Sequence, residues 1–183
     1  MIMAEQATFQ IEFKELPQLE LPEKVQAEEV DTLSFKTQLQ DEAMASLEWA
    51  SPTALLLGKL DGRVVSIVGI LKRVIIAGRK SIQVVGLGGV ATHPDFRRRG
   101  YAQRLIDAAG VWIKRQTDCS FGMLFCSREM LGYYERSGWL EVANPLYIEQ
   151  KAGRIPLNSP KMVLPIGTAR WPDGEVDIQG KPW

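Results

Sequence analysis

The sequence has few residues that could bind a metal ion or form disulfide bonds. Its only cysteines are Cys119 and Cys126, and its only histidine is His93. A structural zinc site needs four such ligands, and a disulfide-built domain needs several paired cysteines. We therefore expect neither a metal site nor a disulfide framework, and we expect Cys126 to pack as a small apolar residue at the end of a strand.

The sequence also lacks an excess of one charge and a long hydrophobic run. Its 22 lysines and arginines balance 22 aspartates and glutamates, so the net charge does not attract the chain to nucleic acid or to a membrane surface. No run reaches the ~20 apolar residues of a membrane-spanning helix. Residues 1–13 lack the basic flank and apolar centre of a signal peptide. We expect a cytoplasmic protein with no nucleic acid and no membrane among its partners.

At 183 residues the chain has the length of a single domain. Its strongest local signal is a β-hairpin, because Asp61-Gly62 suits a tight turn and separates the apolar runs 53–60 and 63–76. The other expected strands cover residues 8–13, 81–92, 121–125, 146–149 and 161–164. The expected helices cover residues 35–49, residues 102–113 and the segment before Trp139. The acidic, proline-interrupted segment 16–29 shows no regular period.

Three consecutive arginines stand where a helix is expected to begin. Arg97, Arg98 and Arg99 directly precede Gly100-Tyr101-Ala102. The amino end of a helix already carries roughly half a unit of positive charge and unpaired N–H groups, so these guanidinium groups repel it unless an anion joins them. No Ser, Thr, Asp or Asn occupies the cap position. The pattern predicts a phosphate-binding loop.

The arginines and glycines of this region also fit two other kinds of site. An arginine string is often a solvated surface or a nonspecific nucleic-acid patch, although the balanced charge of the chain argues against the latter. Gly86-x-Gly88-x-x-Ala91 fits the dinucleotide fingerprint in its letters. That fingerprint needs a strand to turn directly into a helix, and here Thr92-His93-Pro94 intervenes. We therefore reject the dinucleotide site. The three glycines in segment 81–92 instead indicate that a ligand or another backbone approaches closely.

The strand, the arginine loop and the following helix together resemble the coenzyme A-binding motif of the GCN5-related N-acetyltransferases, the GNAT family. The family pattern is Gln or Arg, two residues, Gly, one residue, then Gly or Ala, and residues 97–102 satisfy it. A second family element follows at the expected separation: a strand over 121–125, then a helix that closes with Tyr134, three residues, Gly138 and Trp139.

The resemblance implies an α/β (α+β) GNAT fold. Its mixed central sheet would have six to seven strands, largely antiparallel, splayed at the central coenzyme A-binding strand and flanked by about four helices. It implies a single acetyltransferase domain over residues 1–183. Within it, residues 167–183 would form an irregular C-terminal tail that folds back near the acceptor site.

The resemblance also implies roles for individual residues. The backbone N–H groups and arginines of the loop would bind the diphosphate of acetyl-CoA, and the central strand would pair with its pantetheine arm. Tyr134 would be the general acid that protonates the departing thiolate. The hydroxyl of Ser127 would contact the acetyl end or the pantetheine, and no metal would take part. The implied cofactor-binding residues are Val90, Ala91, Thr92, Arg97, Arg98, Arg99, Gly100, Tyr101, Ala102 and Ser127.

The implied function is an N-acetyltransferase that passes acetyl from acetyl-CoA, its cosubstrate, to a primary amine of a small molecule by direct attack in a ternary complex. A homodimer is one expected assembly. Relatives commonly present a glutamate base on the central strand, whereas segment 86–89 of this chain is Gly-Leu-Gly-Gly. A noncatalytic coenzyme A-binding or protein-interaction module therefore remains an alternative. The general base stays open among Glu129, Asp173, Glu175, Asp177 and the carboxylate at the end of the sequence.

Within the family, the pattern is most similar to that of the aminoglycoside 2'-N-acetyltransferases. The similarity runs through segments 71–78, 90–97 and 162–165 to a tail that ends on Trp183. In those enzymes acidic groups of the tail bind the cationic sugar. Lys181 stands here where the relatives carry aspartate, and a cation repels a polyamine. We therefore take the likeness as one of architecture and tail placement.

Overall fold

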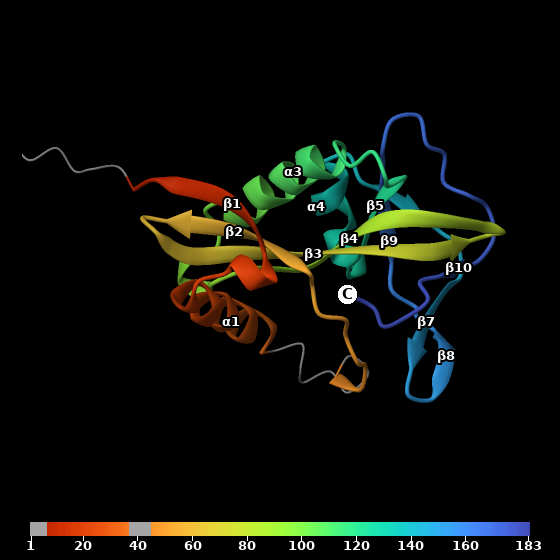
Figure 1. The fold of residues 1–183 in the computed structure, drawn as a ribbon, viewed down its shortest axis with the longest axis horizontal. Helices are drawn as coiled ribbons and strands as arrows, with labels where there is room; N and C mark the ends of the chain where they lie inside the picture. Colours follow the sequence, from red (N-terminus) through yellow and green to blue (C-terminus); the bar gives the residue numbers. More distant parts are fainter. Residues whose placement is uncertain (1–6, 37–44) are drawn as a thin grey trace, which may run out of the picture.

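The structure is a computed structural model that describes residues 7–36 and 45–183. Ten strands form one curved sheet, in which the path β6-β9-β5-β4-β3-β10-β7-β8 is joined by β2 at β3 and by β1 at β2 (Figure 1). The strands are β1 (Phe9–Glu15), β2 (Ala54–Leu60), β3 (Arg63–Ala77), β4 (Lys80–Thr92), β5 (Phe121–Phe125), β6 (Leu140–Val142), β7 (Leu146–Gln150), β8 (Gly153–Pro156), β9 (Lys161–Pro165) and β10 (Val176–Asp177).

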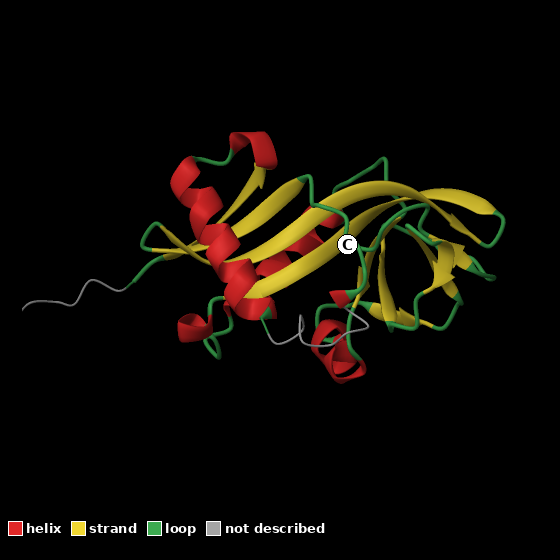
Figure 2. Cartoon of the chain, turned by 90° about the horizontal axis from the view of Figure 1, so that it is seen from below, coloured by secondary structure: helices red, strands yellow, loops and turns green. Residues whose placement is uncertain are grey.

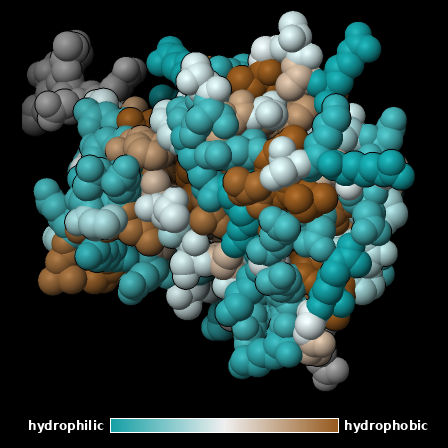
Figure 3. Space-filling view, turned by 45° about the vertical axis from the view of Figure 1, so that its right-hand side comes forward, coloured by the Kyte–Doolittle hydropathy of each residue, from teal (hydrophilic) through white to brown (hydrophobic). Residues whose placement is uncertain are grey.

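Three α-helices within the described residues cover the two faces of this sheet (Figure 2). α3 (Tyr101–Ile113) and α4 (Leu131–Glu135) pack on one face, and α1 (Leu21–Phe35) packs on the other. The face under α1 continues beyond the helix as a second apolar cluster, which the C-terminal residues cover. No helix in the described part is long and apolar enough to span a membrane. In the space-filling view, hydrophobic residues form small areas separated by hydrophilic ones (Figure 3).

The predicted fold class is confirmed, and so is the hairpin at its centre. Asp61 and Gly62 both have positive φ, 48° and 83°, as the tight turn between β2 and β3 requires. The sheet has more strands than the six to seven expected. β6, β8 and β10 contain 3, 4 and 2 residues, which is too short for an alternating pattern to stand out in the sequence.

The first helix lies earlier in the chain than expected. α1 occupies the segment whose prolines and poor period gave no helix prediction, and it ends at Phe35. A capping box begins it, because the Glu23 side chain accepts a hydrogen bond of 2.8 Å from the Glu20 backbone and Pro22 is tolerated in the first turn. The helix predicted over 35–49 falls largely on residues 37–44, which lie outside the described residues.

A buried carboxylate fastens α1 to the sheet. Glu23 is 6 % exposed, and it accepts hydrogen bonds from Lys14 on β1 and from Lys59 on β2, the latter at 2.6 Å. Burial alone would raise the pKa of Glu23, but these two ammonium groups outweigh it and lower the pKa to about 2. Glu12 adds a second carboxylate, 2.7 Å from Lys59. The network connects α1, β1 and β2.

Replacing Glu23 by Gln is expected to lower the free energy of unfolding by about 3 kcal/mol at pH 7, because two largely buried ammonium groups lose their main partner. In the native protein the lowered pKa of Glu23 contributes stability above pH 4.5 that is lost as the pH falls toward 2. The variant should lose this part of the acid dependence. Urea unfolding at several pH values measures both effects. Glu28→Gln, at an exposed position of the same helix, is the control, and equal losses for the two variants would contradict the assignment.

Candidate active site

β4 and β5 run side by side and then separate. Parallel pairing joins Val84–Leu87 to Phe121–Leu124 and goes no further. Beyond it, β4 keeps its antiparallel partner β3 but has a bulge, because Gly69 pairs with Gly88 while Ile67 pairs with Ala91. Gly89 lies in the bulge with φ of 56°, a conformation that suits glycine. The β5-facing edge of β4 after Leu87 is therefore open to a ligand that pairs like a strand.

The predicted pantetheine-binding residues all lie on this open stretch. Ala91 is buried in the core under α1, and Val90 packs on the opposite face against the core under α3. Ser66 on β3 fixes the end of β4, since its hydroxyl donates to the carbonyl of Ala91 at 2.7 Å and lies 2.8 Å from the Thr92 hydroxyl. The backbone of β4 is thus held in place from the β3 side.

The arginine loop leads from β4 into α3. After Thr92 a 3-10 turn spans Pro94–Phe96, and α3 begins at Tyr101. Arg98 and Gly100 adopt left-handed backbone angles, with φ of 62° and 77°, which turn the chain sharply before the helix. No side chain within residues 7–36 and 45–183 caps this end of α3, so its first N–H groups are available donors. An anion is the ligand that such an end binds best.

The three arginine side chains differ in their surroundings. Arg97 Nε donates to the Thr92 carbonyl at 3.1 Å, and Arg99 donates to the Asp95 carbonyl at 3.4 Å while it lies over the ring of Phe96. In the described part of the chain, none of the three forms an ion pair with a carboxylate. Their positive charge adds to that of the helix end, as a diphosphate site requires.

Tyr101 and Ala102 form the first turn of α3 and are partly buried. The ring of Tyr101 stacks on Phe9 of β1 with centroids 4.3 Å apart, and Arg104 covers the same ring of Phe9 at 4.4 Å. These contacts fix the start of the helix against the sheet, so the N–H groups of this turn have a defined direction.

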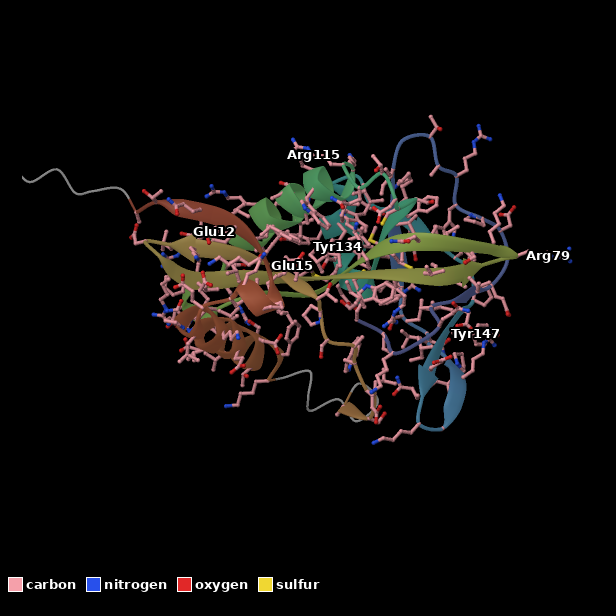
Figure 4. All side chains as sticks on the ribbon, viewed as in Figure 1. Glu12, Glu15, Arg79, Arg115, Tyr134 and Tyr147 are labelled. Atoms are coloured by element: carbon pink, nitrogen blue, oxygen red, sulfur yellow. The ribbon has the colours of Figure 1, made fainter. Side chains whose placement is uncertain are left out.

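Tyr134 lies inside the molecule on α4 (Figure 4). It is 6 % exposed, and its ring meets Tyr133 and Trp139 edge to face. Its hydroxyl has no hydrogen-bond partner among the described residues, unlike the usual core tyrosine. Burial, and to a smaller degree the neighbouring Cys126 and Tyr133, raises the pKa of Tyr134 well above its ordinary value. The phenol therefore keeps its proton across the neutral range.

A polar cluster joins the end of α4 to α3. The Ser137 hydroxyl donates to Asp107 at 2.7 Å, and Gln103 donates to Asp107 at 3.0 Å and to Ser137 at 2.5 Å. The N–H of Ser137 also donates to the carbonyl of Tyr134 at 2.9 Å. Tyr134 and the arginine loop are therefore attached to the same helix, which fixes their relative positions.

Ser127 and Cys126 follow β5 directly. Ser127 is exposed at the start of a 3-10 turn, and its hydroxyl, after the backbone N–H of Glu129, helps to lower the pKa of the Glu129 carboxyl. Cys126 packs against the core under α3, as expected, and burial raises its pKa to about 11, so it is a thiol at neutral pH. The described residues contain no cluster of three or more potential metal ligands.

The C-terminal residues lie on the glycines of β4, on the face opposite α3. A Cβ atom at Gly86 would collide with the ring of Trp183, and one at Gly88 would lie 2.6 Å from the Trp183 backbone. The indole N–H donates to the Met123 carbonyl at 3.3 Å. Arg73 donates to the carbonyl of Lys181 at 2.6 Å and lies over the indole ring. The close approach that the glycines indicate is therefore made, at these two positions, by the tail of the chain itself.

Of the five carboxylates considered as bases, the one at the end of the sequence lies over Gly88 of β4, and the four side-chain carboxylates lie in different surroundings. Glu175 and Asp177 bind Arg154 at 2.9 and 2.6 Å, Asp173 is exposed beside the turn at Gly78, and Glu129 is exposed after β5. Figure 4 shows the β3–β4 turn, marked by Arg79, far from Tyr134. This placement separates Asp173 from the open edge of β4.

Two glycine substitutions should have opposite effects on stability. Gly86→Ala is expected to lower the free energy of unfolding by about 1–3 kcal/mol, because the added methyl group must displace Trp183. Gly110→Ala should raise it by about 0.5–1 kcal/mol, since a Cβ there meets only Leu164 at 3.6 Å inside α3. Urea unfolding measures both changes. A neutral Gly86→Ala would contradict the tail contact.

Several solved structures share this fold. The structure is similar to an acyl-CoA N-acyltransferase from Pseudomonas aeruginosa, with a TM-score of 0.59 and 18 % identity over 85 % of this chain and 99 % of that one. It is similar to the GNAT family N-acetyltransferase YhbS from Escherichia coli in complex with CoA, with a TM-score of 0.58 and 17 % identity over 97 % and 92 % of the two chains. A GNAT family acetyltransferase from Brucella melitensis in complex with acetyl-CoA gives 0.53 and 18 % identity over 91 % and 94 %.

These identities are low, so the similarity establishes the fold. Among curated protein sequences, none matches this chain closely enough to count as a relative. At the level of sequence families, the description "Acetyltransferase (GNAT) domain" matches residues 21–142. That range is more than half of the chain, and it contains the arginine loop, both strands of the splay and the helix of Tyr134. The chain therefore belongs to the GNAT acetyltransferase family.

Proposed function

We propose that the protein is an N-acetyltransferase that moves the acetyl group of acetyl-CoA to a primary amine of a small molecule by direct attack in a ternary complex. One observation carries this proposal: the open edge of β4 leads directly into a cationic loop and an uncapped helix end. A ligand with amide groups at one end and a diphosphate at the other matches both features. Coenzyme A is such a ligand.

Different residues of the chain bind different parts of acetyl-CoA. The N–H groups of Arg98–Ala102 bind the diphosphate, with the guanidinium groups supplying further attraction. The free backbone edge of Val90–Thr92 pairs with the amides of the pantetheine arm. A backbone N–H of the bulge at Gly89 polarises the thioester carbonyl, which is worth about 3 kcal/mol in comparable sites. Ser127, which follows β5, supplies a hydroxyl that contacts the acetyl end or the pantetheine.

Acetyl-CoA supplies the activated acetyl group, and Tyr134 supplies a proton. The amine nitrogen forms a bond to the carbonyl carbon, the carbon–sulfur bond breaks, and the thiolate takes the proton of the Tyr134 hydroxyl. The amine loses its own proton to solvent or to a carboxylate, of which the carboxylate at the end of the sequence lies over Gly88, and solvent returns a proton to the Tyr134 phenolate. The products are the N-acetyl amide and free coenzyme A.

Calorimetry with acetyl-CoA is the first test, followed by thiol release from acetyl-CoA on a panel of amines. We expect micromolar binding and amine-dependent release of thiol. The lack of a carboxylate on β4 favours a second candidate, a noncatalytic coenzyme A-binding module. Binding without thiol release on any amine would support that candidate, and undetectable heat at millimolar acetyl-CoA would exclude both.

The resemblance to the aminoglycoside 2'-N-acetyltransferases concerns the tail. We propose that the tail borders the acceptor site here as well, since Trp183 lies on β4 beside the splay. The acceptor itself should differ. Lys181 extends its ammonium group to Glu48 at 2.8 Å, so at this position the tail presents a paired cation where the relatives carry aspartate.

A further inference from the structure

Lys161 is a buried cation that has no partner among the described residues. It is the first residue of β9 and is 7 % exposed. In the part of the chain that the structure describes, no carboxylate forms an ion pair with it and its ammonium group donates no hydrogen bond; Glu141 acts on it only from a longer distance. Its nitrogen is not fully enclosed. In this part of the chain, the fully buried side-chain nitrogen that lacks a partner is Nε1 of Trp139.

The strand register places Lys161 on the face that carries the tail. Lys161 pairs directly with Phe125 of β5 and with Val142 of β6, and directly opposed residues of an antiparallel pair project to the same face. Phe125 is the first residue of β5 beyond its pairing with β4. Its ring lies 5.0 Å from that of Trp183, which in turn covers Gly86 and Gly88. We call Gly88, Phe125, Lys161 and Trp183 the acceptor face.

The charges on this side of the sheet include the cations Arg73 and Lys161 and the carboxylate at the end of the sequence, which lies over Gly88 and forms no ion pair with Lys161. Arg73 is half-buried and lies over Trp183, and among residues 7–36 and 45–183 its guanidinium group donates to one carbonyl. Burial lowers its pKa, although Glu149 opposes this. Burial likewise lowers the pKa of Lys161, against a smaller opposite effect of Glu141. Glu48, the nearest acidic residue of the tail contact, is already bound by Lys151 and Lys181.

A buried charge without a partner is unfavourable, and a bound anion would relieve the cost. We infer that the ammonium group of Lys161 binds a carboxylate of the acceptor, so that the substrate is a primary amine that also carries a carboxylate group. The inference rests on the proposed function. The rings of Phe125 and Trp183 form the apolar part of the same face, and they would contact the carbon skeleton of the substrate.

Matched pairs of amines test the substrate class. Phenylalanine is compared with phenylalanine amide, and 4-aminobutanoate with 4-aminobutanamide, by thiol release from acetyl-CoA. We expect kcat/KM to be at least tenfold higher for the acid in at least one pair. Equal values for acid and amide, or a preference for the amide, in both pairs would overturn the inference.

Three variants test whether Lys161 binds the carboxylate of the acceptor. Lys161→Met should reduce kcat/KM for the preferred acid by 10- to 100-fold and leave its amide within twofold. Lys161→Arg, which keeps the charge, should retain the preference for the acid. Lys80→Met removes one positive charge from an exposed site at the start of β4 and should change neither substrate. A preference that survives in folded Lys161→Met would refute the role of Lys161.

Binding gives a measurement that needs no turnover. 3-Phenylpropanoate, a carboxylate without an amine, is titrated into the wild type and Lys161→Met, with and without coenzyme A. We expect binding to the wild type that Lys161→Met weakens at least tenfold. If the carboxylate binds in this way while coenzyme A does not, the proposed function fails and the anion site stands. If coenzyme A binds and the carboxylate does not bind at millimolar concentration, the inference fails alone.

Discussion

Tyr134→Phe is expected to lower kcat for acetyl transfer by about 10²- to 10⁴-fold, because the departing thiolate then leaves without a proton donor. The affinity for acetyl-CoA should stay within twofold, since the ring and its packing against Tyr133 and Trp139 are unchanged. Stability should also hold, because the hydroxyl has no hydrogen-bond partner to lose among the described residues. Thiol release under saturating substrates, calorimetry and thermal unfolding measure the three quantities.

The neighbouring tyrosine is the matched control. Tyr133→Phe removes the same atom one residue away on the same short helix, and kcat should change by less than threefold. The rate of the wild type should also rise with pH as the acceptor amine loses its proton. Because burial raises the pKa of Tyr134 above its usual 10, no loss of its proton should reduce the rate below that pH. If Tyr134→Phe and Tyr133→Phe behave alike, Tyr134 is only a packing residue.

Local chemistry made the centre of the fold predictable from the sequence. The Asp61-Gly62 turn, the strands around it and the start of α3 after the arginines follow from neighbouring residues, and the structure has all three. α1 was not predictable in this way. Its buried side carries Glu23, while Leu21 and Val25 are 75 % and 56 % exposed, so its apolar pattern does not show which side packs. Only the network with Lys14 and Lys59 explains the burial of Glu23.

The sequence predicted only those residues of the candidate site that belong to a recognisable motif. Residues 97–102 could be named from the arginines before an uncapped helix end, Tyr134 could be named from the resemblance to the GNAT family, and their roles stay predictions. The contact of Trp183 with Gly86 and the pairing of Lys161 with Phe125 join residues that are distant in the sequence. No local pattern specifies such a pairing, because register over long separations is decided by the packing of the whole sheet. The glycines signalled a close approach without showing which group makes it.

Gly100→Val is expected to raise the dissociation constant of acetyl-CoA by at least tenfold. Gly100 has φ of 77° and turns the chain into α3, and a Cβ atom there would meet nothing within 4 Å. That open space adjoins the N–H groups of the helix end. A diphosphate must approach these donors to about 2.9 Å, so a branched side chain excludes it, and each charge-assisted hydrogen bond that is lost weakens binding by about 1.5–3 kcal/mol.

A second glycine separates this effect from backbone strain. Gly62, in the β2–β3 turn, also has a positive φ, 83°, and open space at its Cβ position. Gly62→Val should therefore reduce stability by a similar amount, about 1–2 kcal/mol, and leave the affinity for acetyl-CoA unchanged. Calorimetry measures the affinity of both variants for acetyl-CoA, and urea unfolding measures their stability. If both variants lose stability equally and only Gly100→Val loses affinity, the diphosphate binds at the start of α3. If the two variants have equal affinities, the ligand binds elsewhere, and the main support for the proposed reaction is removed.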